Sequence, residues 1–505
     1  MPQISRRGFL QSAVCAGALV FAPRLGAAAG LRFDADPFSL GVASGSPTAD
    51  GFVIWTRLAP EPRSANPAGP GGVTSGDVEI RYEVAADDSF RSIVRRGTCI
   101  AERAFAHSVH LEMSGLDAWR PYWYRFMSGD AVSRTGRAMT APAIGSPLER
   151  LRLGFVSCSN YEHGYFAGYR HLADESPDIF LCLGDYIYEG VDTTSRTVRR
   201  HSDGIEAKTL AAYRNRYAQY RLDPDLQRLH AEVPALVTWD DHEVQNDYAD
   251  RWSQNYDETE GFLQRRAAAY QAFYEHMPVR ASRSLPNGPM MRIYDRYTFG
   301  ALAEIAMIDV RQYRSRQACY EERRMGRGHL ETRESCPELL AAQRSMLGPE
   351  QERWLFDGLS GSRSRWNIIA QDVLMAQLRE RNDRGEIGYW TNDWNGYPKA
   401  RKRLINHLHE SRVANPVVFT GDIHSYWAND LKLDFDDPTS PVVATELVGT
   451  SISSHGREAG FFERFLPDNP HVKFVDSSKR GYVFVELAPR ELTARDRAVS
   501  EGSRR

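Results

Sequence analysis

The sequence has no excess of charge of either sign. Its 505 residues include 63 Lys and Arg against 66 Asp and Glu, which gives a formal net charge of −3. A protein that coats a polyanion normally has a basic excess, so nucleic acid is disfavoured as an obligate partner. The composition, 42% apolar and 26% charged, is that of an ordinary globular protein. It argues against global disorder, collagen and a coiled coil, and the length is typical of two to four domains.

Long hydrophobic runs are absent after the first thirty residues. No later segment approaches about 18 uninterrupted apolar residues, so we expect no transmembrane segment in the mature protein. At the start, Arg6-Arg7-Gly8-Phe9-Leu10 precedes an apolar run over residues 13–22, and Ala27-Ala28-Ala29 follows it. This order predicts an export signal over residues 1–29, and the paired arginines favour the twin-arginine (Tat) export machinery. We therefore expect a periplasmic or extracellular protein; a chance Arg-Arg in an ordinary secretory signal is the alternative.

Several catalytic signatures are missing as well. The sequence contains no Gly-x-Ser-x-Gly, no Gly-x4-Gly-Lys-Ser/Thr, no His-Glu-x-x-His and no Cys-x-x-Cys. These absences argue against a serine hydrolase, a P-loop NTPase and a zincin.

Only five cysteines follow the predicted signal, an odd number that leaves at least one thiol unpaired or bound to something else. Cys319 and Cys336 flank a stretch rich in Arg and Glu, and a disulfide there would contribute about 3 kcal/mol. Two unpaired surface thiols are the alternative. Cys182 lies within an apolar run and is predicted to be a core residue.

The chain divides into two regions that differ in their pattern of predicted secondary structure. Residues 34–140 contain short β-branched or aromatic runs at 52–55, 78–84, 109–113 and 122–126, which predict a β-sandwich of immunoglobulin or fibronectin type. Residues 140–149 are interpreted as a linker. From 150 to 488, strands alternate with helices, predicted at 209–230, 261–276 and from Pro349 to Gly358, so we expect an α/β domain. Residues 489–505 are interpreted as a C-terminal tail.

Six apolar runs of the second region end on polar residues. The runs and their ends are 151–156 before Cys158, 178–183 before Asp185, 235–239 before Asp240-Asp241-His242, 303–308 before Asp309, 368–370 before Asp372, and 417–420 before Asp422 and His424. Parallel strands would bring these ends to one crevice. Carboxylates and a thiol so close together repel one another unless cations compensate them, so the pattern predicts a metal site.

The residue types also bear on which metals bind. Thiolate, phenolate and imidazole suit a transition metal, and ferric iron tolerates phenolate and carboxylate well. A remainder dominated by carboxylates suits Ca²⁺, Mg²⁺ or Mn²⁺. Two unlike metals that share a bridging carboxylate are the natural arrangement, and two-metal sites perform in-line displacement at phosphorus.

The motifs at these strand ends resemble those of the PhoD-type alkaline phosphatases, a family that includes PhoD-like phospholipase D. They are Gly184-Asp185-x-x-Tyr188, Trp239-Asp240-Asp241-His242-Glu243, Asp309-x-Arg311-Gln312-Tyr313-Arg314 and Gly421-Asp422-Ile423-His424-Ser425. The resemblance spans essentially the whole mature chain. It implies a calcineurin-like metallophosphoesterase core, with two mixed sheets packed together and helices outside, and it implies Fe³⁺ with Ca²⁺.

The resemblance also implies a role for each residue. Asp185 would bridge the metals, with Cys158 and Tyr188 as iron ligands. Asp422 and His424 would be further ligands. Asp241 would bind the second metal, with Asp240 as the runner-up ligand, and His242 would be the catalytic histidine. Arg311 and Arg314 would stabilise charge on the phosphate oxygens, or else form a solvated pair. Asn395 stands where many relatives carry Asp, which leaves its contact with substrate open.

The sequence therefore predicts an exported phosphoesterase in which a metal-bound hydroxide attacks phosphorus. Phosphate monoesters and diesters are both open as substrates. Phospholipase D-like hydrolysis of phospholipid headgroups is the alternative within this class. A cell-surface binding module with an inactive enzyme domain is the alternative from another class.

Overall fold

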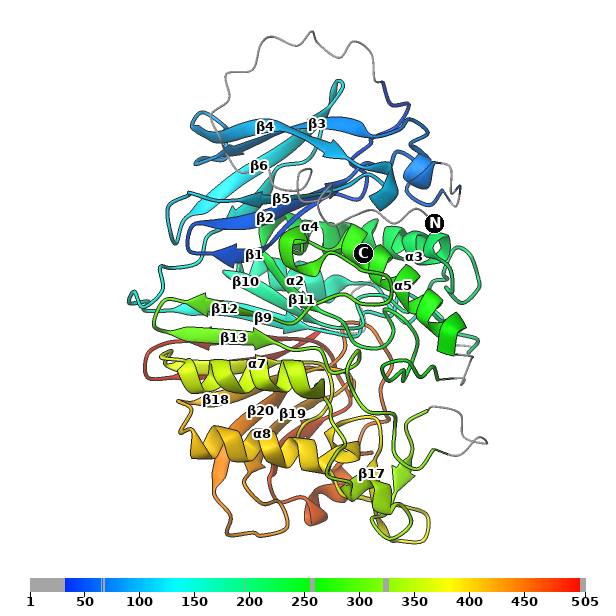
Figure 1. The fold of residues 1–505 in the computed structure, drawn as a ribbon, viewed down its shortest axis with the longest axis vertical. Coiled ribbons are helices and arrows are strands. Elements are labelled where there is room, and N and C mark those ends of the chain that lie inside the picture. Colours follow the sequence, from blue (N-terminus) through cyan, green and yellow to red (C-terminus); the bar gives the residue numbers. More distant parts are fainter. Residues whose placement is uncertain are drawn as a thin grey trace.

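The structure is a computed structural model that describes residues 32–499 except 65, 67–68, 195, 255–258 and 321–326. The predicted export signal, residues 1–29, lies outside the described residues. Among the helices that are described, none combines the length and the hydropathy of a membrane span. Figure 1 shows strands stacked in layers, with helices between and beside them.

Two mixed sheets form the centre. In sheet order, the first contains β23 (Leu492–Val499), β22 (Arg480–Leu487), β9 (Leu151–Val156), β10 (Ile179–Leu183), β11 (Ala235–Thr238), β1 (Val42–Thr48), β2 (Gly51–Arg57) and β5 (Ser108–Met113). The second contains β12 (Asp295–Phe299), β13 (Ala303–Met307), β15 (Trp366–Ala370), β18 (Pro416–Thr420), β20 (Val442–Val448), β19 (Tyr426–Lys432) and β21 (Val472–Asp476). The strands β9, β10 and β11 are parallel to one another, as are β13, β15 and β18.

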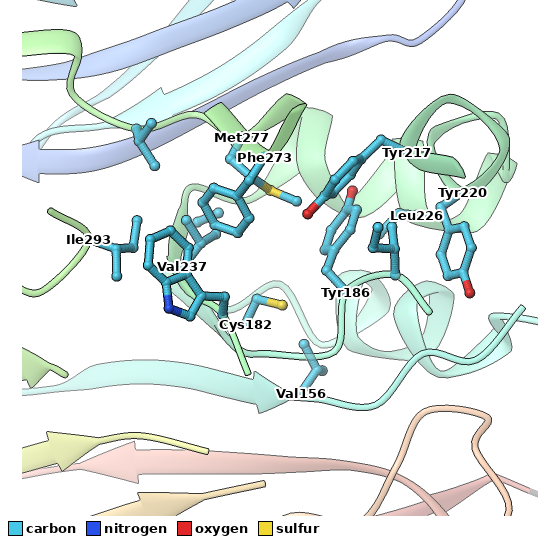
Figure 2. Packing of buried hydrophobic residues seen from close by; sticks show 14 of the residues in the cluster. Val156, Cys182, Tyr186, Tyr217, Tyr220, Leu226, Val237, Phe273, Met277 and Ile293 are labelled. Carbon is cyan, nitrogen blue, oxygen red and sulfur yellow. The ribbon is translucent and has the colours of Figure 1, made fainter. Parts of the chain in front are cut away.

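Alternate side chains of the central strands belong to two different hydrophobic cores, one on each face of the sheet. Leu181 and Leu183 of β10 pack between the two sheets, together with Phe419 of β18. Phe180 and Cys182 point the other way, into the cluster shown in Figure 2. Because both faces of the strand are buried, its sequence is an unbroken apolar run. The prediction that Cys182 is a core residue is confirmed.

Helices cover the outer faces of both sheets. The first sheet is covered by α2 (Ala167–Asp174), α3 (Leu210–Arg221), α4 (Pro224–Glu232) and α5 (Thr259–His276), and the second by α7 (Gly348–Gly361) and α8 (Pro398–Glu410). The helix predicted over 209–230 is two helices, because Pro224 starts a new one behind the Asp223 cap. Helix α7 also continues past Gly358 to Gly361. A Cβ on Gly358 would overlap the Arg296 guanidinium, so this glycine permits close packing and does not end the helix.

The N-terminal strands pack in two layers, one of which is continuous with the first central sheet. One layer contains β3 (Val78–Ala85), β4 (Ile93–Ala101), β6 (Pro121–Ser128), β7 (Ala131–Val132) and β8 (Gly136–Met139), and it shares a core with β1, β2 and β5. These last three strands continue the first central sheet, since Gly45 of β1 pairs with Ala235 of β11. The predicted tail is also partly wrong, because β23 pairs with β22 along its whole length.

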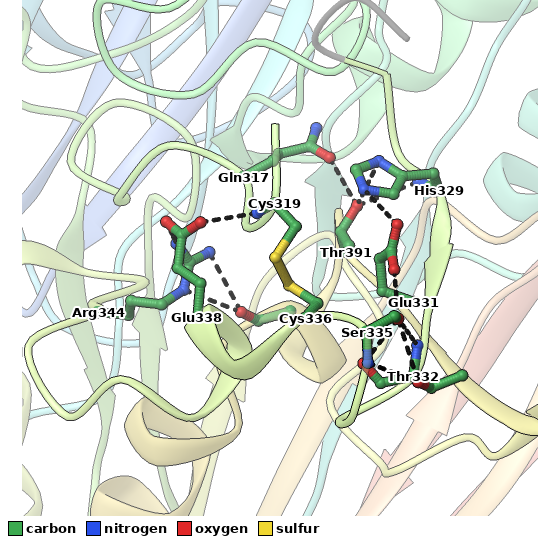
Figure 3. Close-up of a disulfide and its surroundings, with 11 residues drawn as sticks. Gln317, Cys319, His329, Glu331, Thr332, Ser335, Cys336, Glu338, Arg344 and Thr391 are labelled. Atoms are coloured by element: carbon green, nitrogen blue, oxygen red, sulfur yellow. Dashed lines mark hydrogen bonds and ion pairs between the residues drawn. A yellow bond between two sulfur atoms is a disulfide. The ribbon is translucent and has the colours of Figure 1, made fainter. Parts of the chain in front are cut away.

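A disulfide joins Cys319 and Cys336, as predicted (Figure 3), with their Cα atoms 5.7 Å apart. Two residues before it, Gln317 accepts a hydrogen bond from the Thr391 hydroxyl at 2.8 Å. Thr391 follows β17 (Ile387–Trp390), which forms a small sheet with β14 (Leu330–Glu331) and β16 (Glu380–Arg381). The cross-linked loop therefore supports a segment that reaches the site described next.

Candidate active site

The ends of the parallel strands of both sheets meet at one place, as the sequence predicts. Arg311 shows this convergence most directly. Its guanidinium bonds Asp240, which follows β11, and lies 3.9 Å from Asp372, which follows β15, and from Asp422, which follows β18. Residues from two different sheets therefore share a single buried region.

The turns that follow these strands have an unusual backbone. Cys158, Asp185, Asp422 and His424 all adopt left-handed conformations, with φ between 54° and 61°. Each such residue costs about 1–2 kcal/mol relative to the ordinary conformation. Gly184 also has a positive φ, of 96°, and a Cβ on it would lie 2.5 Å from Asp240. Strained turns persist only where the surrounding structure holds them, and they cluster at functional sites.

One side of the site, which we call the cysteine side, consists of Cys158, Tyr188 and His424 together with the shared residue Asp185. Ligand atoms of Cys158, Asp185 and His424 lie within 4.8 Å of one another. The Tyr188 hydroxyl donates to Asp185 Oδ2 at 2.8 Å and lies 3.2 Å from His424 Nε2. His424 Nδ1 bonds the carbonyl oxygen of His455 at 2.7 Å, which leaves Nε2 directed at the group.

Burial disfavours the charged forms of the acidic groups on the cysteine side. It raises the pKa of Cys158, Asp185 and Tyr188 well above their usual values, and the neighbouring acidic groups raise them further. A bound cation reverses this preference, because it favours the deprotonated form of each ligand.

The other side, which we call the arginine side, consists of Asp240, Asp241 and Arg311. Arg311 is fully buried. Its Nη2 atom lies 3.3 Å from Asp241 Oδ2, and Nη1 donates to the Asn392 side-chain oxygen at 2.8 Å. Asp185 again belongs to the group, because its ligand atom lies within 4.8 Å of those of Asp241 and His242.

His242 stands between the two sides and is held by Glu189. The Nδ1 atom of His242 lies 2.6 Å from Glu189 Oε2, and the other oxygen of Glu189 accepts from the backbone of Asn246. Burial lowers the pKa of His242, but Glu189, followed by Asp185 and Asp241, outweighs this effect and raises it well above its usual value. Nε2 therefore remains as the nitrogen that is free to act.

The two arginines are not a solvated pair, because both guanidinium groups are buried. Arg314 donates to the carbonyl oxygens of Asn392 and Tyr248, at 2.9 Å and 2.8 Å. The Arg311 Nη2 atom is out of line for a hydrogen bond with any acceptor in the described part of the chain. Nη2 therefore has donor capacity to spare.

The donor set fits bound cations. Asp240 Oδ2 and both carboxylate oxygens of Asp372 are buried, and no donor among the described residues bonds to them. Burial and the nearby Asp240 carboxylate raise the pKa of Asp372 well above its usual value. Buried carboxylates in this state are compensated by protons or by metal ions.

Some functional residues escape sequence reasoning. Glu189 has one available signal, its position directly after Tyr188. Asn392 carries no motif signal, yet its side chain links Arg311 to Arg314. Asn395 does not reach the site, because it is buried and accepts from the backbone of Leu378 and from Arg401.

Comparison with known proteins identifies the family of this chain. The family model described as PhoD-like phosphatase matches residues 153–495, and the model of that family's N-terminal domain matches residues 25–142. Alkaline phosphatase D of Bacillus subtilis (strain 168) is 43% identical over 470 residues, which cover 92% of this chain and 78% of that protein. A solved structure titled "Structure of PhoD" superposes with a TM-score of 0.87 at 42% identity, over 93% of this chain and 88% of that one. This chain therefore belongs to the PhoD-like phosphatase family.

Proposed function

We propose that this protein hydrolyses phosphate esters with the help of two bound cations. The observation that carries the proposal is the pair of ligand groups, Cys158-Asp185-His424 and Asp185-Asp241-His242, which share Asp185. A shared carboxylate between two groups is the arrangement of a two-metal phosphoesterase site. Membership of the PhoD-like phosphatase family supports the same activity.

The proposed metals are Fe³⁺ and Ca²⁺. The cysteine side, with thiol, phenol and imidazole donors, suits the iron. Asp241, with Asp240 as the runner-up and Asp422 nearby, offers the oxygen ligands that Ca²⁺ prefers. When bound, such cations polarise the phosphoryl oxygens and lower the pKa of an attacking water.

The protein's own residues supply the remaining chemistry. His242 is fixed through Nδ1 by Glu189 at 2.6 Å, so its Nε2–H can protonate the departing ester oxygen. Arg311 Nη2, which has no acceptor in line, can donate to an equatorial phosphate oxygen. Arg314 acts less directly, since its donors hold the backbone around Asn392 and Tyr248 in place.

The same proposal includes export of the protein and a more specific classification of its two structural regions. The arginine pair Arg6-Arg7 supports export by the twin-arginine route to the periplasm or beyond, after the cations have been loaded into the folded protein. The four-layer arrangement of helices and two mixed sheets supports a calcineurin-like core. The two N-terminal layers support an immunoglobulin-like sandwich.

A panel of esters tests the activity. We expect the metal-replete protein to hydrolyse p-nitrophenyl phosphate, its bis-ester, or both, and dialysis against a Ca²⁺ chelator to abolish this activity until Ca²⁺ is restored. If headgroup release from a phospholipid is faster than hydrolysis of both simple esters, the phospholipase D-like alternative is favoured. Hydrolysis of none of these esters would favour an inactive binding module.

A further inference from the structure

A cavity of about 350 Å³ opens beside the proposed metal site. Asp422 and His424 line one part of it. The remaining lining residues are Leu378, Glu380, Trp390, Asp393, Ile423, His455, Gly456, Arg457, Phe461 and Phe462. Half of these are large and apolar. A phosphoryl group is bound by charge and hydrogen bonds, so the site needs no apolar wall to hold phosphate alone.

The apolar wall is held in place by its own packing. Trp390, the last residue of β17, pairs with Leu330 of β14, and a Cβ on Gly328 would lie 2.7 Å from its indole nitrogen. Also in the lining, Phe461 stands edge-on to Phe462, with the ring centroids 5.0 Å apart. Rings fixed in this way lose little freedom when a ligand binds, which favours affinity.

Burial disfavours the charged forms of the acidic residues in this cavity. It raises the pKa of Glu380 above its usual value, although Arg457 opposes this shift, and it raises the pKa of Asp393 to about 8. Asp393 also accepts a hydrogen bond from the backbone of Asn395 at 2.6 Å. The Arg457 guanidinium lies 4.9 Å from the centre of the Phe461 ring. The cavity therefore offers an ester group mainly apolar surface.

We infer that this cavity binds the organic ester group of the substrate, and that it favours a group with a flat apolar face. The inference rests on the proposed function, because it places the phosphoryl group at Asp422 and His424 and the ester group against Trp390 and Phe461. It narrows the substrate class from phosphate esters in general to esters of bulky alcohols or phenols with an apolar face.

Two phosphate esters of different size test the apolar wall. Phenyl phosphate has a flat ring that can lie against the apolar wall, whereas methyl phosphate has almost no apolar surface, and phosphate release measures both reactions. We expect Phe461→Ala and Trp390→Leu each to lower kcat/KM for phenyl phosphate on the order of 10-fold, mainly through KM. The loss for methyl phosphate should be several-fold smaller, because its methyl group gains little from either ring. The two esters differ in intrinsic reactivity, but this difference does not affect the result, because each variant is compared with wild type on the same ester.

A matched control completes the design. Phe474 on β21 is 44% exposed and lies outside the cavity lining, so Phe474→Ala should change neither reaction.

The outcomes separate the inference from the function on which it rests. If Phe461→Ala and Trp390→Leu lower kcat/KM equally for both esters, or for neither, the cavity does not bind the ester group. A wild-type protein that hydrolyses neither of these esters nor the bis-ester of p-nitrophenol would instead refute the proposed function, and the inference with it.

Discussion

The two sides of the proposed metal site differ in what balances their charge. On the arginine side, the Arg311 guanidinium lies between the carboxylates of Asp240 and Asp241. On the cysteine side, arginines reach Tyr188 and His424 only at their backbone carbonyl oxygens. The Tyr188 hydroxyl contacts Asp185, His424 and Ser454 instead. The arginine side therefore has a counter-charge of its own, whereas burial favours the neutral forms of the acidic groups on the cysteine side.

This difference suggests separate tasks for the two sides. A side that is neutral until it binds a metal favours a firmly held ion, because deprotonation and binding occur together. A side that carries its own counter-charge can exchange a hard divalent ion more easily. Asp185 couples the two, since it belongs to both ligand groups.

Removing the shared carboxylate should have the largest effect. Asp185→Asn keeps the size of the side chain but takes away the bridging charge, so we expect hydrolysis to fall by about 10³-fold or more, the scale of losing an essential group. The control is Asp174→Asn, because Asp174 is an exposed residue whose partner is Arg228. Steady-state kinetics on p-nitrophenyl phosphate measures both. Activity within a factor of ten of wild type would rule out a bridging role for Asp185.

Removing the Arg311 counter-charge should destabilise the arginine side more than the cysteine side. Arg311→Met leaves Asp240 and Asp241 without their partner, and we expect a loss of about 3–5 kcal/mol in the free energy of unfolding of the metal-free protein. Added Ca²⁺ should recover part of this loss, because a cation then replaces the guanidinium. Calorimetry with and without Ca²⁺ checks it. If the loss is the same in both conditions, Arg311 and the cation do not share these carboxylates.

A smaller effect is expected from the residue that holds His242. Glu189→Gln should lower kcat by about 10²-fold, the scale of losing a group that supports general acid catalysis. Glu189 stabilises the charged imidazolium, so a neutral amide lowers the pKa of His242. A reaction that needs protonated His242 then loses activity at a lower pH than in wild type. The measurement is kcat as a function of pH, and an alkaline limb that does not move would contradict this role.

The sequence predicts the site better than it predicts the framework around it. Residues that can bind metals come directly after predicted strands in the sequence. Parallel strands bring their ends together, whatever the details of side-chain packing. The sheet continuity through Gly45 and Ala235 depends on a contact between residues 190 positions apart, and no local pattern encodes it. Asn392 is missed for the same reason, because only the folded chain brings it to Arg311. The sequence of β23 predicts a tail and not a strand, because it is exposed and charged and shows no strong apolar alternation.

Metal analysis of three variants tests the two-sided site most directly. Wild type and the variants Cys158→Ser, Asp241→Asn and Asp185→Asn would be purified identically, and their iron and calcium contents measured together with the visible spectrum. We expect Cys158→Ser to lose iron selectively, Asp241→Asn to lose calcium selectively, and Asp185→Asn to lose both. Iron-loaded wild type should be coloured through the Tyr188 phenolate, and Tyr188→Phe should bleach or shift that band. Equal loss of both metals from the Cys158 and Asp241 variants, or an unchanged band in Tyr188→Phe, would contradict two unlike cations joined at Asp185.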